Sequence, residues 1–381
     1  MTVCLSPNGC AVSKGAAPST ELLVGTIRGI VHFRRSAPTE PWQELRRSIP
    51  DVHISSILRE PRSGWLFAGG HGHGGLWMSP DRGETWVPRG NGIAERHVFH
   101  VAAREWSGDV VLYVGVEPAK LYRSYDLGES WELVPALNDV PGTDKWSFPP
   151  PPHLAHAKNV SWHPSDPDTF YVCVEQGALL KTTDDGGYFR ELSDYESDDD
   201  LFYHDVHRVV IREANPDQMF LTGGEGVHYS DDAGETWKHI QTRHDRLGYP
   251  DALVIDAHDE NVVFVAGAGE PPRTWAEQSL GTANAAVIRT DDGGRTWYEV
   301  NDGLPSPLKG NIEAMSMHAH RDGIELFIGT ATGEVYYSPD RGAKWTAVAT
   351  GLPPVSKVHH YRWFLSPAER ARIEEQARLG F

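Results

Sequence analysis

Ser79-Pro-Asp81-Arg-Gly83-Glu-Thr-Trp86 is one of six copies of an eight-residue pattern, Ser/Thr-x-Asp-x-Gly-x-x-aromatic. The other five copies begin at Ser124, Thr182, Ser230, Thr290 and Ser338. In a tight turn, the Asp side chain accepts hydrogen bonds from the backbone amides that follow it, and Gly adopts the positive φ that the turn needs. The pattern therefore predicts six equivalent turns, each followed by an aromatic residue that re-enters a sheet.

The spacing of these aromatic residues indicates one architecture. A weaker copy, which ends at Trp42, lacks the Asp and the Gly, and with it the aromatic residues stand at positions 42, 86, 131, 189, 237, 297 and 345. The intervals range from 44 residues (42 to 86) to 60 residues (237 to 297). Repeats of about 40 to 50 residues are typical of β-propeller blades. The sequence therefore predicts an all-β, seven-bladed propeller.

The pattern resembles the Asp-box of the BNR-repeat superfamily, and the resemblance covers almost the whole chain. In that family the boxes lie between the third and fourth strands of each blade, away from the central site, so the resemblance implies a structural role for them. The family includes sialidases, other glycoside hydrolases, sorting receptors and photosystem assembly factors. The stretch Gly25-Thr-Ile-Arg28-Gly-Ile30 keeps the Arg of the sialidase Arg-Ile-Pro motif but lacks the Pro, so we do not expect a sialidase.

Strand-like runs predict how the ring closes. The first such run of the chain, residues 21–26, has the character of a second strand, and its blade lacks a first strand. We expect a late run, residues 358–365, to complete that blade, because an unclosed ring leaves two exposed sheet edges. The predicted organisation is an N-terminal tail (1–20), a single propeller domain (21–365) and a short C-terminal helix (366–381) that begins with the capping box Ser366-Pro-Ala-Glu369.

Composition argues against several kinds of partner. The formal net charge is −18, from 35 Lys and Arg against 53 Asp and Glu, which argues against binding to nucleic acid or to an anionic membrane. No apolar run approaches the length of a membrane span, and the first 20 residues lack the apolar core of a signal peptide. Three cysteines, an odd number, make a reduced, cytoplasmic setting the simplest expectation, although a processed secreted chain stays open.

Histidines gather where the chain enters the first, channel-lining strand of several blades. Examples are Arg96-His97, His153-x-x-His156, His204-x-x-His207-Arg208 and His359-His360-Tyr361-Arg362. Radial repetition should bring these positions together around the axis, on the face opposite the Asp-boxes. Converging imidazoles and carboxylates are suitable ligands for zinc, manganese, iron or copper, and suitable acid/base groups near neutral pH.

This pattern yields three sets of predicted site residues. The predicted metal ligands are His97, His156, His207 and His359. The predicted catalytic residues are His97, His207, Arg208, Glu225, Tyr361 and Arg362, with the arginines suited to hold a carboxylate. The predicted substrate-binding residues are Arg28, Trp146, Arg273 and Trp275, of which the last three lie in two insertions, 135–152 and 270–285, that should form walls beside the site.

The sequence thus favours an enzyme with a divalent-metal site that acts on a polar anionic substrate, with a glycan as the best guess and hydrolase or lyase chemistry. Two other functions stay open. One is a non-catalytic binding or assembly propeller, which an exposed apolar patch around Trp146 and Trp275 would favour. The other is an oxidoreductase with His-ligated iron or copper, because ligand type alone does not determine the reaction. The oligomeric state stays open as well.

Overall fold

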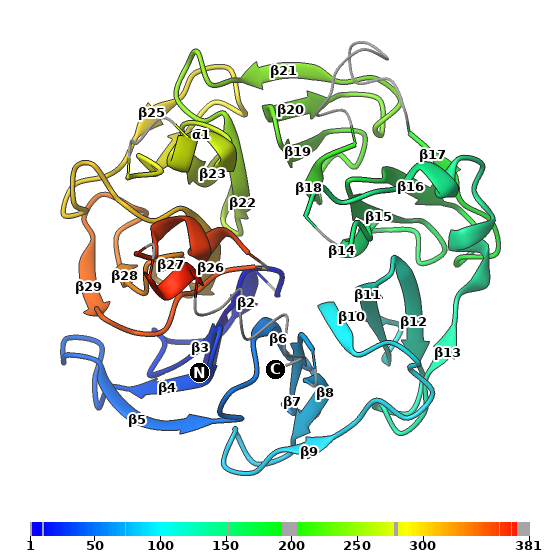
Figure 1. The fold of residues 1–381 in the computed structure, drawn as a ribbon, viewed down its shortest axis with the longest axis horizontal. Coiled ribbons are helices and arrows are strands. Elements are labelled where there is room, and N and C mark those ends of the chain that lie inside the picture. The colour runs from blue at the N-terminus through cyan, green and yellow to red at the C-terminus, as the bar shows by residue number, and fades with distance from the viewer. Residues whose placement is uncertain are drawn as a thin grey trace.

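The protein is described by a computed structural model that covers residues 2–9, 11–72, 74–150, 152–192, 204–277, 281–357, 359–366 and 368–371. Seven sheets of four or five strands are arranged around a central axis (Figure 1). The chain is therefore a seven-bladed β-propeller, as predicted. No helix in these ranges is long and apolar enough to cross a membrane.

Blades 2 to 4 place their strands in chain order from the axis outward (Figure 1). Blade 2 consists of β6 (Ile54–Arg59), β7 (Leu66–Gly70), β8 (Gly75–Ser79) and β9 (Val87–Pro88). Blade 3 consists of β10 (His97–Trp106), β11 (Asp109–Glu117), β12 (Lys120–Ser124) and β13 (Glu132–Leu133). Blade 4 consists of β14 (His156–Trp162), β15 (Phe170–Glu175), β16 (Ala178–Thr182) and β17 (Arg190–Glu191).

Blades 5 and 6 follow the same order, and blade 7 differs by one added strand. Blade 5 consists of β18 (Val206–Ile211), β19 (Met219–Gly223), β20 (Gly226–Ser230) and β21 (Lys238–Gln241). Blade 6 consists of β22 (Tyr249–Asp256), β23 (Asp259–Ala268), β24 (Ala286–Thr290) and β25 (Tyr298–Glu299). Blade 7 consists of β26 (Ile312–His320), β27 (Gly323–Thr330), β28 (Val335–Ser338) and β29 (Thr346–Ala349), with β2 (Val12–Lys14) added along β26.

The Asp-boxes form the turns between the third and fourth strands of their blades. In blade 2, Ser79 Oγ donates to Asp81 Oδ1 (2.8 Å) and accepts from the N–H of Gly83 (2.8 Å). The Asp81 carboxylate also accepts from the N–H and the hydroxyl of Thr85. Bonds from the first Ser or Thr to the Asp, and from the Gly N–H to that hydroxyl, recur in the other five boxes. Gly83 has φ +82°, as its turn requires.

The aromatic residue that ends a box joins its blade to the preceding one. Trp131 of blade 3 donates its indole N–H to Arg89 O, just after blade 2 (2.8 Å), and Trp345 of blade 7 donates to Val300 O, just after blade 6 (2.8 Å). Because each bond satisfies a polar atom of a large apolar side chain, the indole ring can pack between blades without a desolvation penalty. The boxes therefore have the structural role that the resemblance implied.

The ring is not closed by the C-terminal run, so that prediction is wrong. The innermost strand of blade 1 is instead β1 (Thr2–Leu5), which pairs in parallel with β3 (Glu21–Thr26). The sheet then continues outward through β4 (Gly29–Arg34) and β5 (Gln43–Ser48). Every residue of β1 is buried, and Val3 and Leu5 pack between blades 1 and 7. A short apolar strand thus covers the edge of β3. The C-terminal residues 360–364, which are rich in polar and bulky side chains, form the 3-10 helix η3 (His360–Phe364) and not a strand.

The N-terminal residues are not a tail, contrary to the prediction for residues 1–20. Between β1 and β2 the chain crosses the axis and contacts several blades. The N–H of Asn8 donates to Ser55 O of blade 2 (2.8 Å), and Asn8 O accepts from His100 of blade 3. Ser316 of blade 7 donates to Cys4 O (2.7 Å). Residues 2–9 and 11–14 are therefore part of the propeller.

The C-terminal residues cross the same axis at its other side and cover the ends of several blades. We call residues 353–357 and 359–366 the strap. Two backbone hydrogen bonds attach it to the blades. Ile27 N–H of blade 1 donates to Pro354 O (2.9 Å), and Val355 N–H donates to Thr330 O of blade 7 (3.0 Å). Ser366 and Glu369 form the predicted capping box, with Ser366 Oγ donating to Glu369 Oε2 (2.6 Å). Helical residues are described as far as 371, and the rest of the predicted helix lies outside the described residues.

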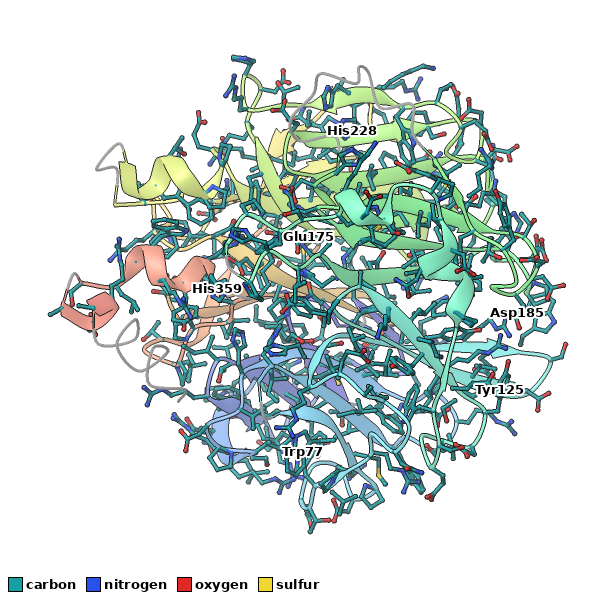
Figure 2. All side chains as sticks on the ribbon, turned by 45° about the vertical axis from the view of Figure 1, so that its right-hand side comes forward. Trp77, Tyr125, Glu175, Asp185, His228 and His359 are labelled. Atoms are coloured by element: carbon teal, nitrogen blue, oxygen red, sulfur yellow. The ribbon has the colours of Figure 1, made fainter. Side chains whose placement is uncertain are left out.

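The two insertions that lengthen the repeat contain short helices. The first, between blades 3 and 4, contains the 3-10 helices η1 (Pro135–Asp139) and η2 (Thr143–Lys145). The second, within blade 6, contains α1 (Pro272–Glu277), which lies against η3 through the stacked rings of Trp275 and Phe364, with centroids 5.4 Å apart. The strap and the second insertion lie at the side of the molecule opposite the Asp-box residue Asp185 (Figure 2).

Candidate functional site at the mouth of the propeller

Innermost strands begin, and second strands end, at the end of the axis that we call the mouth. This follows from their antiparallel pairing, which sets His97 opposite Glu117 in blade 3 and His156 opposite Glu175 in blade 4. An isolated bridge joins Glu175 to Asp205 of blade 5. Figure 2 shows Glu175 near the axis, far from the peripheral Asp-box residue Asp185. Strand register therefore brings polar side chains of neighbouring blades together.

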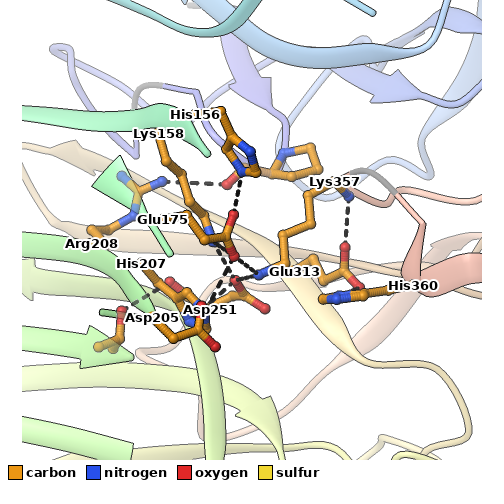
Figure 3. Close-up of polar contacts among 12 residues, drawn as sticks. His156, Lys158, Glu175, Asp205, His207, Arg208, Asp251, Glu313, Lys357 and His360 are labelled. Atoms are coloured by element: carbon orange, nitrogen blue, oxygen red, sulfur yellow. Dashed lines mark hydrogen bonds and ion pairs between the residues drawn. The ribbon is translucent and has the colours of Figure 1, made fainter. Parts of the chain in front are cut away.

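Two carboxylates and two lysines form a buried group at this point, which we call the ion core (Figure 3). Lys357 Nζ donates to Glu175 Oε1 (2.8 Å) and to Asp251 Oδ1 (2.5 Å). Lys158 Nζ donates to the same two oxygens, at 2.9 and 3.0 Å. All four side chains are at most 4% exposed. Buried charges must be paired, and here each of the two carboxylates accepts hydrogen bonds from both amino groups.

These contacts determine the charge states of the ion core. Burial raises the pKa of Glu175, but the two ammonium groups outweigh burial and hold that pKa well below its ordinary value. The pKa of Asp251 is lowered because the ammonium groups outweigh burial in the same way. Burial lowers the pKa of Lys357, but the two carboxylates outweigh burial and raise it well above its ordinary value. At neutral pH both carboxylates and Lys357 are therefore charged.

His207 lies beside the ion core with its two ring nitrogens in different surroundings. Its Nδ1 lies 2.7 Å from Pro250 O, which has no proton to donate, so Nδ1 carries the proton of this hydrogen bond. Its Nε2 faces Asp205 Oδ1 at 3.2 Å and Glu175 Oε1 at 3.3 Å. A nitrogen lone pair that faces two carboxylates needs a cation between them, which is either a second proton on the ring or a metal ion.

Among the described residues, Glu175, Asp205 and His207 are the group of metal-ligating side chains whose ligand atoms all lie within 4.8 Å of one another. One nitrogen and two carboxylate oxygens suit zinc, manganese or iron. The hydrogen bond from the other ring nitrogen of His207 to a backbone carbonyl is the second contact usual for a metal-bound imidazole. This group could therefore hold a metal ion.

More imidazoles lie next to the ion core, from blades 2 and 3 and from the strap. His53 and His71 have ring centroids 4.7 Å apart, and those of His71 and His97 are 5.9 Å apart. Burial lowers the pKa of His53 to about 4 and that of His359 to about 3. Burial also holds the pKa of His71 well below its ordinary value, and the nearby imidazoles of His53, His97, His156 and His359 lower it further. These buried rings are therefore neutral at physiological pH.

His156 connects this row of histidines to the ion core. Its Nε2 lies 2.5 Å from Glu175 Oε2, and its Nδ1 lies 3.6 Å from Glu117 Oε2. Its ring stacks on Phe99, with centroids 3.7 Å apart. The Nδ1 of His156, like His71 Nε2 and His359 Nδ1, is buried and has no hydrogen-bond partner in the part of the chain that the structure describes. Such nitrogens can act as ligands or as proton acceptors.

Most of the predicted metal and catalytic residues lie at the mouth, but of the four predicted metal ligands only His207 belongs to the group that could hold a metal ion. His97, His156, His207 and His359 all lie at the mouth, and Tyr361 and Arg362 lie in η3 of the strap. Tyr361 is buried, with its ring 6.3 Å from that of His53. Arg208 lies one residue further along β18 than His207, where it donates to Pro7 O (3.4 Å) and lines an axial cavity of about 280 Å³.

The two tryptophans predicted to bind substrate, Trp146 and Trp275, differ in how deeply they are buried. Trp146 is half-buried against blade 4, and the nearby Phe148 ring lies 5.0 Å from that of His156, so the first insertion borders the mouth. The expectation that Trp275 is an exposed wall is wrong, because it is 1% exposed and packs against Tyr249 and Phe364. The remaining residues are placed as follows: Arg28 is exposed in the β3–β4 hairpin, Glu225 is half-buried in the β19–β20 hairpin, and the backbone of Arg273 lies in α1.

Four residues of the site were absent from the predictions, namely Lys158, Asp205, Asp251 and Lys357. The period of two along a strand was the available signal for two of them. Lys158 follows His156 by two positions and Asp205 precedes His207 by two, so each pair lies on one side of its strand and reaches the same carboxylate or ring. Lys357 carries no such signal, because it lies outside the blades.

Comparison with known proteins agrees with the repeat and the fold. Residues 228–239 match the BNR/Asp-box repeat family. A xyloglucanase from Paenibacillus sp is 23% identical over 267 residues, which is 62% of this chain. The chain spans 24% of the length of that relative.

Solved structures with the same fold have diverse descriptions. An ancestral GH74 enzyme matches with a TM-score of 0.58 at 15% identity, over 77% of this chain and 37% of its own. YCF48 from Cyanidioschyzon merolae matches with a TM-score of 0.55 at 15% identity, over 84% of this chain and 96% of its own. The WD40 propeller domain of Doa1 matches with a TM-score of 0.57 at 9% identity, over 89% of this chain and 95% of its own. At these identities the likeness concerns the fold alone.

Proposed function

We propose that this Asp-box propeller is an enzyme that holds a divalent metal ion at its mouth, between His207, Asp205 and Glu175, and acts on a polar glycan. The observation that carries the proposal is the orientation of His207. Its Nδ1 is committed to Pro250 O, and its Nε2 faces two carboxylate oxygens at 3.2 and 3.3 Å. A bound cation would relieve the repulsion among these three acceptors, and zinc, manganese or iron would suit them.

Acid/base roles in this enzyme fall to His156 and His97. His156 is in contact with Glu175 through one nitrogen, and its other nitrogen is directed toward Glu117 at 3.6 Å, so it can pass a proton between the two sides of the site. His97 lies 4.0 Å from Glu117 and its side chain is 45% exposed, which puts it at the rim, where substrate enters. Tyr361 and Arg362 of the strap face the site from the other side and would hold substrate hydroxyl or carboxylate groups.

A glycan is the favoured substrate for two reasons. The similarity to a xyloglucanase extends over 62% of this chain. Phe148 lies beside His156, and Trp146 lies two residues before it, so aromatic rings are available for stacking on a sugar. Hydrolysis and lyase-type elimination both fit a metal ion with an adjacent acid/base pair.

The test compares His207→Gln with wild type and with His244→Gln, which changes an exposed histidine outside the site. Elemental analysis of untagged protein, after incubation with zinc, manganese, iron and copper salts, should give near-stoichiometric metal in wild type and His244→Gln. We expect His207→Gln to lose the metal and to lose turnover of xyloglucan and uronate-containing oligosaccharides by roughly 10²-fold or more, with an unchanged circular dichroism spectrum. Wild-type protein without metal would refute the metal site, and iron or copper would favour a redox enzyme.

A second candidate function is a non-catalytic binding or assembly propeller. The observation in its favour is that the ion core is at most 4% exposed and lies beneath the strap, as expected of a group that holds blades together. In that case, substitutions at His207, Asp205 or Glu175 would change the stability of the protein, and wild-type protein would turn over none of the glycans.

A further inference from the structure

One cation of the ion core comes from outside the blades. Lys158 belongs to β14, whereas Lys357 belongs to the strap and reaches the carboxylates of blades 4 and 6 from above. Figure 3 shows Lys357 entering the group from the strap, with Lys158 on the other side of Glu175. The ammonium group of Lys357 is therefore a tethered cation that is inserted between two carboxylates.

The strap is fixed on both sides of this lysine by a third carboxylate. Glu313 Oε2 accepts from the backbone N–H of Lys357 (2.6 Å) and from Ser356 Oγ (3.0 Å). Glu313 Oε1 lies 3.1 Å from His360 Nδ1. The Lys357 side chain and the Glu313 contacts together hold residues 356–360 over the ion core, so docking of the strap depends on buried charges.

Lys357 and the proposed metal ion depend on the same oxygen atom. Glu175 Oε1 accepts from Lys357 Nζ at 2.8 Å and lies 3.3 Å from His207 Nε2. A metal ion bound to Glu175 would lie about 2 Å from this oxygen. It would then lie within about 5 Å of the Lys357 ammonium, where two positive charges in a buried site repel each other strongly.

We infer that Lys357 is a positioning residue whose tethered ammonium competes with the metal ion for Glu175, so that metal binding and docking of the strap oppose each other. The inference rests on the proposed function, because it places the metal at His207, Asp205 and Glu175. Coupling of this kind is reciprocal: the docked strap weakens metal binding, and bound metal releases the strap. Release opens a path for substrate to the ion core.

The test uses Lys357→Met, which keeps a long side chain and removes the charge. Competition with a chelator should give a zinc or manganese affinity at least tenfold tighter for Lys357→Met than for wild type. Lys357→Arg keeps the charge, so its metal affinity should stay near that of wild type. This variant also tests whether the fold tolerates a change at position 357. Hydrogen exchange at Val355 and Tyr361, whose N–H groups bond to Thr330 O and Ser356 Oγ, should accelerate in wild type when metal is added. In Lys158→Met, the strap should stay protected without metal, because that lysine belongs to a blade.

The outcomes separate this inference from the proposed function. If wild type binds metal and Lys357→Met binds it equally or more weakly, or if metal leaves exchange in the strap unchanged, the coupling is refuted and the metal site stands. If Lys357→Met binds metal and wild type does not, the competition is supported, whereas the proposal that the wild-type protein holds a metal ion is refuted. If neither binds metal, while both remain folded by circular dichroism, the inference and the metal site fail together.

Discussion

Arg35 and Glu325 form the most deeply buried ion pair between blades 1 and 7 in the described structure. Both side chains are 1% exposed, and Arg35 Nη2 lies 2.5 Å from Glu325 Oε1. Arg35 also lies over the ring of Trp42, 4.5 Å from its centroid, in the blade that lacks an Asp-box. The ion pair thus joins blade 1, which has no Asp-box, to blade 7.

Loss of Arg35 should therefore be costly. Arg35→Met leaves Glu325 buried without its cation, and we expect the free energy of unfolding to fall by about 3–5 kcal/mol, measured by urea denaturation. Arg47→Met is the matched control, because Arg47 and Glu44 pair on the surface with 52% and 40% exposure, and a change within about 1 kcal/mol is expected there. Equal effects of the two substitutions would contradict the fastening role.

Residues of the candidate site differ in how far their places could be predicted. The entry positions of His97, His156 and His207 recur from blade to blade, so radial symmetry predicts their convergence. The charged groups beside these histidines were harder to predict, since Asp251 lies in a mostly apolar strand and Lys357 in a segment without repeat pattern. A repeat predicts where equivalent positions meet, but not which charges will balance there.

At the level of elements, the Asp-box turns were predictable because the hydrogen bonds that their Ser/Thr and Asp side chains make with the Asp and the Gly N–H lie within the eight residues of each box. The innermost strand of blade 1 was not. β1 has four residues and pairs in parallel with β3, so no hairpin joins the two strands and local sequence carries little signal. The strap was mistaken for that strand because residues 358–365 follow the last box at the place where a next blade would begin.

If β1 is an integral strand, its apolar residues should matter for stability. Leu5 is fully buried between blades 1 and 7, and Leu5→Ala should lower the free energy of unfolding by about 2–5 kcal/mol. Leu45→Ala, in β5 of the same blade, changes a side chain that is 44% exposed and should cost under about 1 kcal/mol. Chemical denaturation of both variants checks this prediction, and a Leu5→Ala protein as stable as the Leu45→Ala protein would mean that β1 is dispensable.

At the scale of the whole molecule, aspartates around the periphery make stability depend on acid. Hydrogen bonds from Thr85 lower the pKa of Asp81 from 3.8 to about 2. In the next box, hydrogen bonds from Ser130 and Ser124 outweigh burial and lower the pKa of Asp126 to about 2. The pKa values of Asp184, Asp232 and Asp292 are lowered as well. The same acid-sensitive turn thus recurs around the ring.

The sign of the pH dependence follows from these lowered pKa values. The unfolded chain binds protons first as pH falls, so the stabilisation is complete above about pH 4 and is lost progressively as pH falls from about 4 to about 2. Thermal unfolding between pH 2 and 7 should show this decline in wild type. Asp81→Asn/Asp126→Asn, which lacks two of the titrating groups, should show a shallower decline; an unchanged slope would rule out a contribution from these turns.

Pairing of β2 with β26 has a consequence for how the chain assembles. Ser13 of β2 pairs with β26 of blade 7, and its hydroxyl donates to Met317 O, 304 positions later. During synthesis, residues 12–14 leave the ribosome before β26 exists, so they can pair with it only after residues 312–320 have been translated. Contacts between residues so distant in sequence slow folding, because the intervening chain must be ordered first. The inner edge of blade 7 can therefore be completed only late in synthesis, by residues that are translated early.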